Sequence, residues 1–298
     1  MLTRFIFIII ACSTCLIAMT SPLFGQTQTA REDSGYRGPI AAVTIRSVKY
    51  SRADGKVTKS KKLLRSTERF DRHGNLLRRV EYEDDGIFNW DERSIFRRGK
   101  VVGWTVSSGP KDDFSSFFYR FDRAGNIIEE NSYDEAGKLS NQTTYKYDRK
   151  NHEIERVSGT RPWEEYKVTI SRYDAKGRQI EVSTFLKTSK SIAPLNDMGY
   201  YRRVLHYGNE KRWNSAESFS ADGKLVSVTK LKRDRYGNET EYVVYNGSGD
   251  VKSKGRYKYD YDRHGNLIVE KSYRLKAGEA TEIYELEEVT YRKYEYFK

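Results

Sequence analysis

The chain has 298 residues, of which 37% are hydrophobic and 32% are charged, and its formal net charge at pH 7 is +12. This fraction of hydrophobic residues is low for a conventional hydrophobic core, although the 23 tyrosines can pack their rings while their hydroxyls remain solvated. Both cysteines, Cys12 and Cys15, lie near the N-terminus. A mature chain without that segment has no disulfide, thiol nucleophile or cysteine-based metal site.

The first element in chain order is a predicted export signal, residues 1–25. Arg4 gives a short positive region, residues 5–19 are apolar but too few to span a membrane comfortably, and Gly25 offers a small residue for cleavage. Two alternatives stay open: an uncleaved anchor, and a lipidated Cys12, because Ile9-Ile10-Ala11-Cys12 resembles a bacterial lipobox. Residues 26–45 are predicted to be an N-terminal segment that is partly disordered. The predicted location is secreted, periplasmic or at the bacterial cell envelope.

Residues 46–298 are predicted to form one β domain built from a repeated turn. The repeat is an aromatic residue, Asp, two variable residues, Gly and a polar residue, with clear copies at Phe70, Phe121 and Tyr261 and looser copies elsewhere. Asp favours the first position of a type I turn, and Gly adopts the positive φ that follows. This pattern predicts β-hairpins whose loops end in a G1 bulge.

The spacing of the turns predicts how the hairpins are organised. Gly99, Gly125, Asn151 and Gly177 fall 26 residues apart, which suits up-and-down strands of about ten residues. The predicted fold class is therefore all-β: an antiparallel meander of these hairpin repeats that forms a coiled or spiral sheet or an open barrel.

The histidines do not form a candidate catalytic site. His73 and His264 occupy a turn position that holds Ala124 in one copy of the repeat and Lys176 in another, which is typical of a solvent-exposed slot. No metal-ligand spacing links the four histidines. We therefore expect no catalytic residue, no metal and no cofactor.

Departures from the repeat are the better candidates for binding. An acidic connection surrounds Trp90 and includes Asp84, Asp85 and Asp91, while Trp163 and Trp213 are aromatic residues outside the motif that could stack on sugars. A solvated loop and core filling by the tryptophans remain the plainer interpretations. The stretch from Lys187 to Met198 also breaks the repeat and is predicted to be an insertion loop.

The copies at Phe70 and Tyr261 resemble YD repeats, the unit of the bacterial Rhs family, and the resemblance covers about Phe70 to Tyr273. It implies a β-sheet that coils as a spiral strip. In large family members such a strip forms a shell around a toxin domain or a surface module in cell contact. This chain is too short to enclose a cargo, so the repeat fold is what the resemblance implies for it.

The predicted function is that of a non-enzymatic exported β-repeat protein that binds or scaffolds. The positive charge suggests a carbohydrate, an anionic glycan or another envelope component as partner, while export argues against nucleic acid. Membrane contact is expected only through the signal or a lipid at Cys12. The alternative is a glycan-acting enzyme that uses carboxylates from the Glu83–Glu92 and Lys187–Met198 loops.

Overall fold

The computed structural model describes residues 30–53, 56–84, 86–108, 113–160, 165–188, 192–194, 201–208, 211–275 and 283–298. The predicted export signal and Cys12 lie outside these ranges. In the described part, no helix is long and apolar enough to cross a membrane. The predicted β-sheet content is confirmed, because twenty strands and one short helix account for nearly all regular structure there.

The elements, in chain order, are α1 (Ala30–Asp33), β1 (Ile40–Ala53), β2 (Lys56–Lys59), β3 (Leu63–Phe70), β4 (Leu76–Tyr82), β5 (Phe88–Arg97), β6 (Lys100–Ser108), β7 (Asp113–Phe121), β8 (Ile127–Tyr133), β9 (Leu139–Tyr147), β10 (Glu153–Gly159), β11 (Glu165–Tyr173), β12 (Gln179–Thr188), β13 (Ile192–Pro194), β14 (Arg202–His206), β15 (Ser215–Phe219), β16 (Leu225–Arg233), β17 (Glu239–Asn246), β18 (Val251–Tyr261), β19 (Leu267–Leu275) and β20 (Tyr284–Tyr296).

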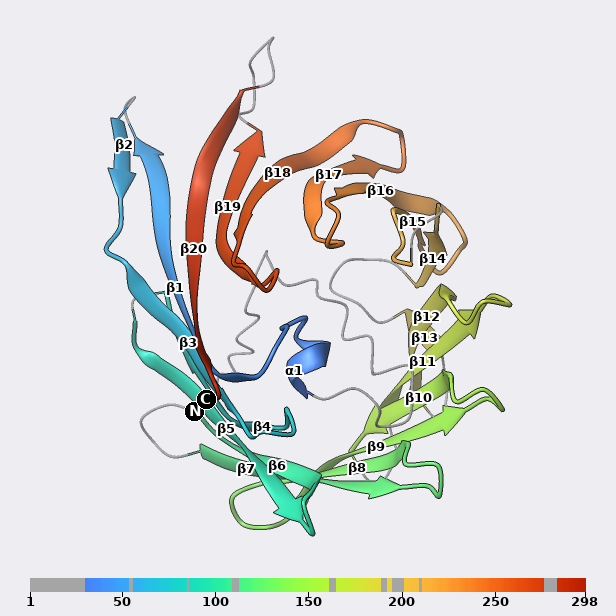
Figure 1. Ribbon diagram of the computed structural model, residues 1–298. Coiled ribbons are helices and arrows are strands. Elements are labelled where there is room, and N and C mark those ends of the chain that lie inside the picture. Colours follow the sequence, from blue (N-terminus) through green and yellow to red (C-terminus); the bar gives the residue numbers. More distant parts are fainter. Residues whose placement is uncertain are drawn as a thin grey trace, which may run out of the picture.

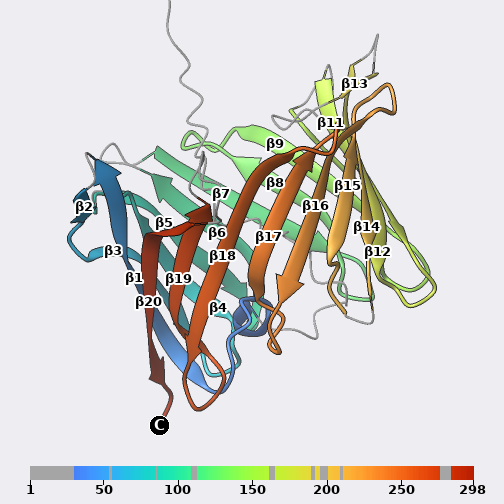
Figure 2. The ribbon, with the colours of Figure 1, turned by 90° about the horizontal axis from the view of Figure 1, so that it is seen from above.

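The strands close into a barrel (Figures 1 and 2). Consecutive strands of the wall pair antiparallel, β3 follows β1 and β14 follows β12, and β20 returns to pair with β1, with Val43 opposite Tyr294. Eighteen strands form this circuit, while β2 and β13 are short additions beside β1 and β12. A barrel of this size is too wide for its wall side chains alone to fill.

The predicted coiled or spiral sheet or open barrel is therefore wrong: the sheet closes. An open sheet would leave the backbone N–H and C=O groups of β1 and β20 without partners along two edges. Pairing these two strands satisfies both edges at once, from Ile40 opposite Tyr296 to Lys49 opposite Glu288. The predicted domain boundary at residue 46 falls inside β1, so the barrel begins at Ile40.

The repeated turns have the geometry that the sequence predicts. In the turn after β7, the Gly125 N–H donates to the Asp122 carbonyl, Gly125 has φ of 90°, and the Asp122 carboxylate accepts from the Asn126 backbone and side chain. Asn151 replaces Gly at one such position with φ of 64°. The register shifts at the start of the next strand, as a G1 bulge requires.

The tyrosines of the repeat stabilise these bulges. Their hydroxyls donate to a backbone carbonyl two residues beyond the positive-φ residue of the preceding repeated turn, at 2.8 Å from Tyr147 to Ile127 and from Tyr173 to Glu153. Further bonds of this kind are Tyr207 to Gln179, Tyr259 to Glu239 and Tyr294 to Leu267. These five tyrosines are therefore structural donors that tie one hairpin to the next, whereas the clear copies at Phe70 and Phe121 have no hydroxyl at the aromatic position.

The N-terminal segment enters one end of the barrel, where α1 lies inside the ring of strands (Figure 1). The Tyr36 ring packs edge-on against Phe70 and Tyr294, at 6.0 and 5.7 Å between ring centroids. Asn266, 1% exposed, holds the backbone of this segment with a reciprocal pair: Arg37 N–H donates to its Oδ1 at 2.6 Å, and its Nδ2 donates to the Arg37 carbonyl at 2.9 Å.

Tyr36 identifies the face of the wall that points into the barrel. Because side chains alternate along a strand, the residues that share the face of Phe70 and Tyr294 point inward, and their neighbours point outward. Glu68 shares the face of Phe70 on β3, and Glu68 lies opposite Arg79 on β4. Arg79 in turn lies opposite Glu92 on β5, so all three point into the barrel.

Candidate binding surfaces

The predicted binding residues do not form one site. Trp90 lies opposite Glu81 and points inward, whereas Asp91 lies opposite Val80 and points outward. Asp84 lies in the turn between β4 and β5, where it pairs with Lys49 and Arg65. These three acidic-loop residues therefore have different surroundings, and their role in binding stays a prediction.

The other predicted residues lie elsewhere. Trp213 precedes β15 and packs under the guanidinium groups of Arg203 and Arg233, at 4.8 and 5.8 Å from its ring centroid. Asp85, Trp163 and most of the Lys187–Met198 insertion lie outside the described residues. Among the described residues, no group of three or more His, Cys, Asp or Glu could hold a metal ion.

The outward face of the barrel carries ion pairs between neighbouring strands. Asp91 is 6% exposed and accepts from Arg78 and Arg93, each at 2.8 Å. Burial raises the pKa of Asp91, but the hydrogen bonds from both arginines outweigh it and the pKa is lowered. Other outward pairs are Arg120–Glu129, Lys146–Glu155, Arg172–Glu181 and Lys232–Glu241.

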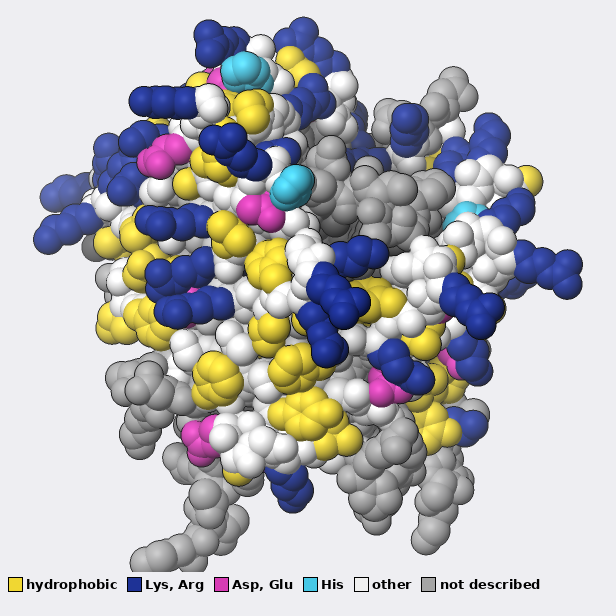
Figure 3. Space-filling model, turned by 60° about the horizontal axis from the view of Figure 1, so that its bottom comes forward, with side chains coloured by type: hydrophobic (Ala, Val, Ile, Leu, Met, Phe, Trp, Pro, Cys, Tyr) yellow, Lys and Arg dark blue, Asp and Glu magenta, His cyan; other side chains and the backbone are white. Residues whose placement is uncertain are grey.

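Basic side chains outnumber acidic ones on the part of the outward face that is drawn in Figure 3. Figure 3 shows one side of the molecule, on which Lys and Arg are dispersed among apolar side chains and Asp and Glu are fewer. Five aromatic rings on β15 to β20 lie under a basic side chain: Phe219 under Arg202, Tyr245 under Lys230, Tyr284 under Arg256, Tyr273 under Lys258 and Tyr291 under Lys62, which precedes β3. We call these pairs the basic–aromatic face.

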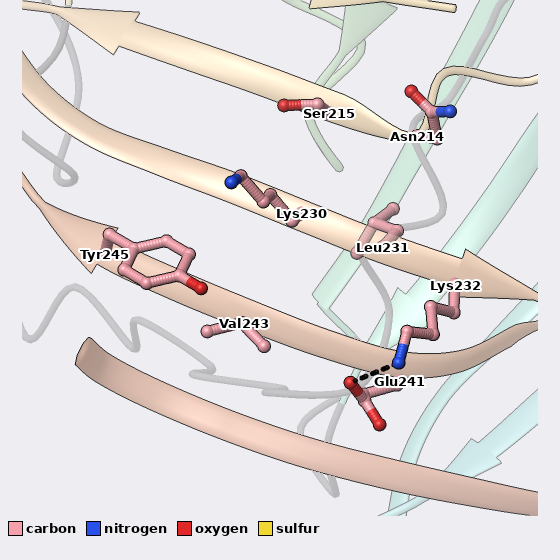
Figure 4. A pocket seen from close by; sticks show the side chains of 8 residues that line it. All are labelled: Asn214, Ser215, Lys230, Leu231, Lys232, Glu241, Val243 and Tyr245. Carbon is pink, nitrogen blue, oxygen red and sulfur yellow. Dashed lines mark ion pairs between the residues drawn. The ribbon is translucent and has the colours of Figure 1, made fainter. Parts of the chain in front are cut away.

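A groove of about 410 Å³ opens within this face, across β15, β16 and β17 (Figure 4). Lys230 lies 5.4 Å from the Tyr245 ring centroid, and Lys232 pairs with Glu241 at 3.1 Å. Glu241 also accepts from Arg256 on β18. Lys230 is therefore the cation of the groove that has an aromatic support but no recorded carboxylate partner within the described residues.

The inward face of β3, β4 and β5 carries a second cluster, made of Glu68, Arg79, Glu81, Trp90 and Glu92. Arg79 Nε donates to Glu68 at 2.9 Å, and its Nη1 lies 3.8 Å from Glu92. Burial raises the pKa of Glu81 and of Glu92. We call this group the inner acidic cluster.

A larger cavity, of about 670 Å³, lies beside β17, β18 and β19 and the turn before β17. Four tyrosines line it: Tyr236, Tyr257, Tyr259 and Tyr261. Two of their hydroxyls serve the fold, because Tyr259 donates to the Glu239 carbonyl and Tyr261 to the Asp234 carboxylate. Two of the four tyrosines that line this cavity therefore hold the fold together.

The sequence does not mark Glu68 and Glu81 as candidate site residues, because both lie in strands that follow the regular repeat pattern. The alternation of side chains along a strand puts Glu81 on the same face as Arg79. Because of the bulge at Phe70, however, the sequence alone does not show whether that face points into the barrel or outward. Trp90 and Glu92 belong to the predicted acidic connection, and of its described members only these two lie in the inner acidic cluster.

Comparisons with known proteins identify no family. No family model matches the chain, and no curated protein matches it. Among solved structures, a porin-like protein from Bacteroides uniformis is similar over 87% of this chain and 98% of its own, with 9% identity and a TM-score of 0.44. A porin-like protein from Bacteroides vulgatus is similar over 86% and 98%, with 11% identity and a TM-score of 0.35.

A third similar structure is the TcdB2–TccC3–Cdc42 complex, with 14% identity and a TM-score of 0.32 over 83% of this chain and 16% of that one. At these scores none of the likenesses supports a functional inference. Membership of the YD-repeat family stays a prediction.

Proposed function

We propose that this chain is a non-enzymatic barrel protein of the bacterial cell envelope, and that its basic–aromatic face binds an anionic glycan. The observation that carries the proposal is the series of Lys and Arg side chains held over aromatic rings on β15 to β20. The role is one of binding and requires no chemical step.

The outward charges favour a barrel surrounded by water. The side chains of Arg120, Lys146 and Lys232 are 65%, 70% and 73% exposed on the outward face. A Lys or Arg on the lipid face of a membrane barrel costs about 2–4 kcal/mol at the bilayer midplane. Such residues distributed around the wall therefore favour the periplasm or the cell exterior over insertion in a bilayer, in keeping with the predicted export signal.

The aromatic rings prepare the cations of this face for binding to an anionic polymer such as a glycan. Each ring holds its cation in place, as Tyr245 holds Lys230, so less side-chain entropy is lost when the cation meets a carboxylate or phosphate. The groove beside Lys230 crosses β15, β16 and β17 and has a volume of about 410 Å³, which is more space than a single small ion needs.

The test is binding of the mature protein to polygalacturonate, with neutral dextran as the matched uncharged polymer. Binding to polygalacturonate should weaken as salt rises, and K230Q and K258Q should each weaken it about fivefold, because a water-exposed contact between unit charges contributes about 1 kcal/mol. K146Q removes the same charge from β9 and should leave binding unchanged. Equal binding to dextran, or an equal loss with K146Q, would rule the proposal out.

A further inference from the structure

The inner acidic cluster plays no part in the proposed function and has an unusual charge balance. We propose that Glu81, Trp90 and Glu92 form a site on the inward wall for an organic cation that carries an alkylammonium or guanidinium group. The site would lie on β4 and β5, on the face opposite to the one that bears Asp91.

The cluster holds more carboxylates than cations. Glu68, Glu81 and Glu92 share Arg79, which donates to Glu68 at 2.9 Å and reaches Glu92 only at 3.8 Å. Glu81 lies directly opposite Trp90 in the ladder. Arg79 is therefore the one guanidinium within the cluster for three carboxylates, while Arg65, which pairs with Asp84, adds positive charge near Glu81 from outside it.

Glu68 gives an independent sign that donors are lacking. Its side chain is 7% exposed, and its Oε1 accepts from Arg79. Its Oε2 has no hydrogen-bond partner among the described residues. A buried carboxylate oxygen without a donor is costly, and the cost falls when a further cation shares the field of the cluster.

An organic cation fits the cluster better than a metal ion does. The described residues include no group of three or more His, Cys, Asp or Glu arranged to hold a metal. Trp90, by contrast, supplies the best aromatic face for a cation, within reach of the carboxylate opposite it. Glu92 is 18% exposed, so a ligand inside the barrel can reach it.

The burial of Glu81 and Glu92 agrees with this assignment, because it raises the pKa of both groups and leaves their charge undercompensated. An ammonium or guanidinium group would supply the missing charge with N–H donors aimed at two carboxylates.

Calorimetric titration of the full chain with 1,4-diaminobutane and with methylguanidinium tests the proposal, and 1,4-butanediol is the uncharged probe of matched length. We expect binding of at least one cation and none of the diol. W90L should weaken binding about 2- to 30-fold, the range of a cation–π contact. The double variant E81Q/E92Q should abolish it.

Controls separate this site from general effects of charge. E130Q removes another buried inward carboxylate, on β8, and should leave affinity unchanged. If E81Q/E92Q unfolds, W90F keeps the packing and must still weaken binding. Absence of heat with both cations, equal binding of the diol, or an equal effect of E130Q would overturn the proposal.

Discussion

Removal of the hydroxyl from Tyr147 or Tyr173 should destabilise the barrel while leaving both rings in place. Each hydroxyl donates at 2.8 Å to the backbone carbonyl of a bulge on a neighbouring hairpin, Ile127 and Glu153 respectively. A Tyr→Phe change removes this donor, so the carbonyl oxygen loses one hydrogen bond. The expected effect is a free energy of unfolding lower by about 1 kcal/mol for each variant, and by up to about 3 kcal/mol where no water replaces the hydroxyl.

Urea unfolding followed by circular dichroism measures this free energy. The matched control is Y133F, because the Tyr133 ring packs edge-on against Phe118 at 6.0 Å while its hydroxyl has no recorded partner in the described part of the chain. Y133F should change the free energy by less than about 0.5 kcal/mol. The double variant Y147F/Y173F should lose the sum of the two single losses, since the two bonds share no donor or acceptor.

The reasoning fails if Y147F and Y173F are no less stable than Y133F. That result would mean that the bulge carbonyls are satisfied equally well by water, and that the aromatic residue of the repeat is selected for its ring alone. A large change in the urea dependence itself would instead indicate that unfolding is not two-state, and the three variants would then be compared by their unfolding rates.

Two further predictions concern charge and the N-terminal segment. Burial raises the pKa of Asp91, but the hydrogen bonds from two arginines outweigh it and the pKa is lowered, so the stabilisation from the Asp91 carboxylate is present at neutral pH and is lost as pH falls below about 4. Urea unfolding at several pH values should therefore show that the free energy of unfolding of D91N falls less steeply in acid than that of the wild type. Parallel plots of this free energy against pH would contradict the prediction. Asn266 pairs with the backbone of Arg37, so N266A should speed tryptic cleavage after Arg37, while N126A, altered at the equivalent position of another turn, should not.

The local structure could be predicted from the sequence because its causes are local. Asp at the start of a turn and Gly or Asn three residues later fix the loop, as Asp148 and Asn151 do with an N–H to carbonyl bond of 3.1 Å. Comparison between copies of the repeat also separated fold-forming positions from variable ones. His264, at a variable position, packs beside Tyr296 at the rim of the barrel.

Closure and the assignment of faces could not be predicted because their causes are not local. No residue near β1 indicates that its second neighbour is β20, at the other end of the chain. Trp90 and Asp91 are adjacent in sequence, yet one points into the barrel and the other out. Which is which depends on every bulge between them and Tyr36, since each bulge shifts the alternation of the strand.

The seam between β1 and β20 has a consequence for how the chain acquires its structure. The two strands are synthesised first and last, yet Ile40 must meet Tyr296, and the Phe297 N–H donates to the Pro39 carbonyl at 2.8 Å. Until β20 has been synthesised, one edge of β1 has no partner, and pairing of such high contact order is slow. The same seam brings Pro39 and Phe297 together at one rim, so a short linker there, with new ends opened in a turn such as that of Gly137, would give a circular permutant whose barrel keeps every pair of strands.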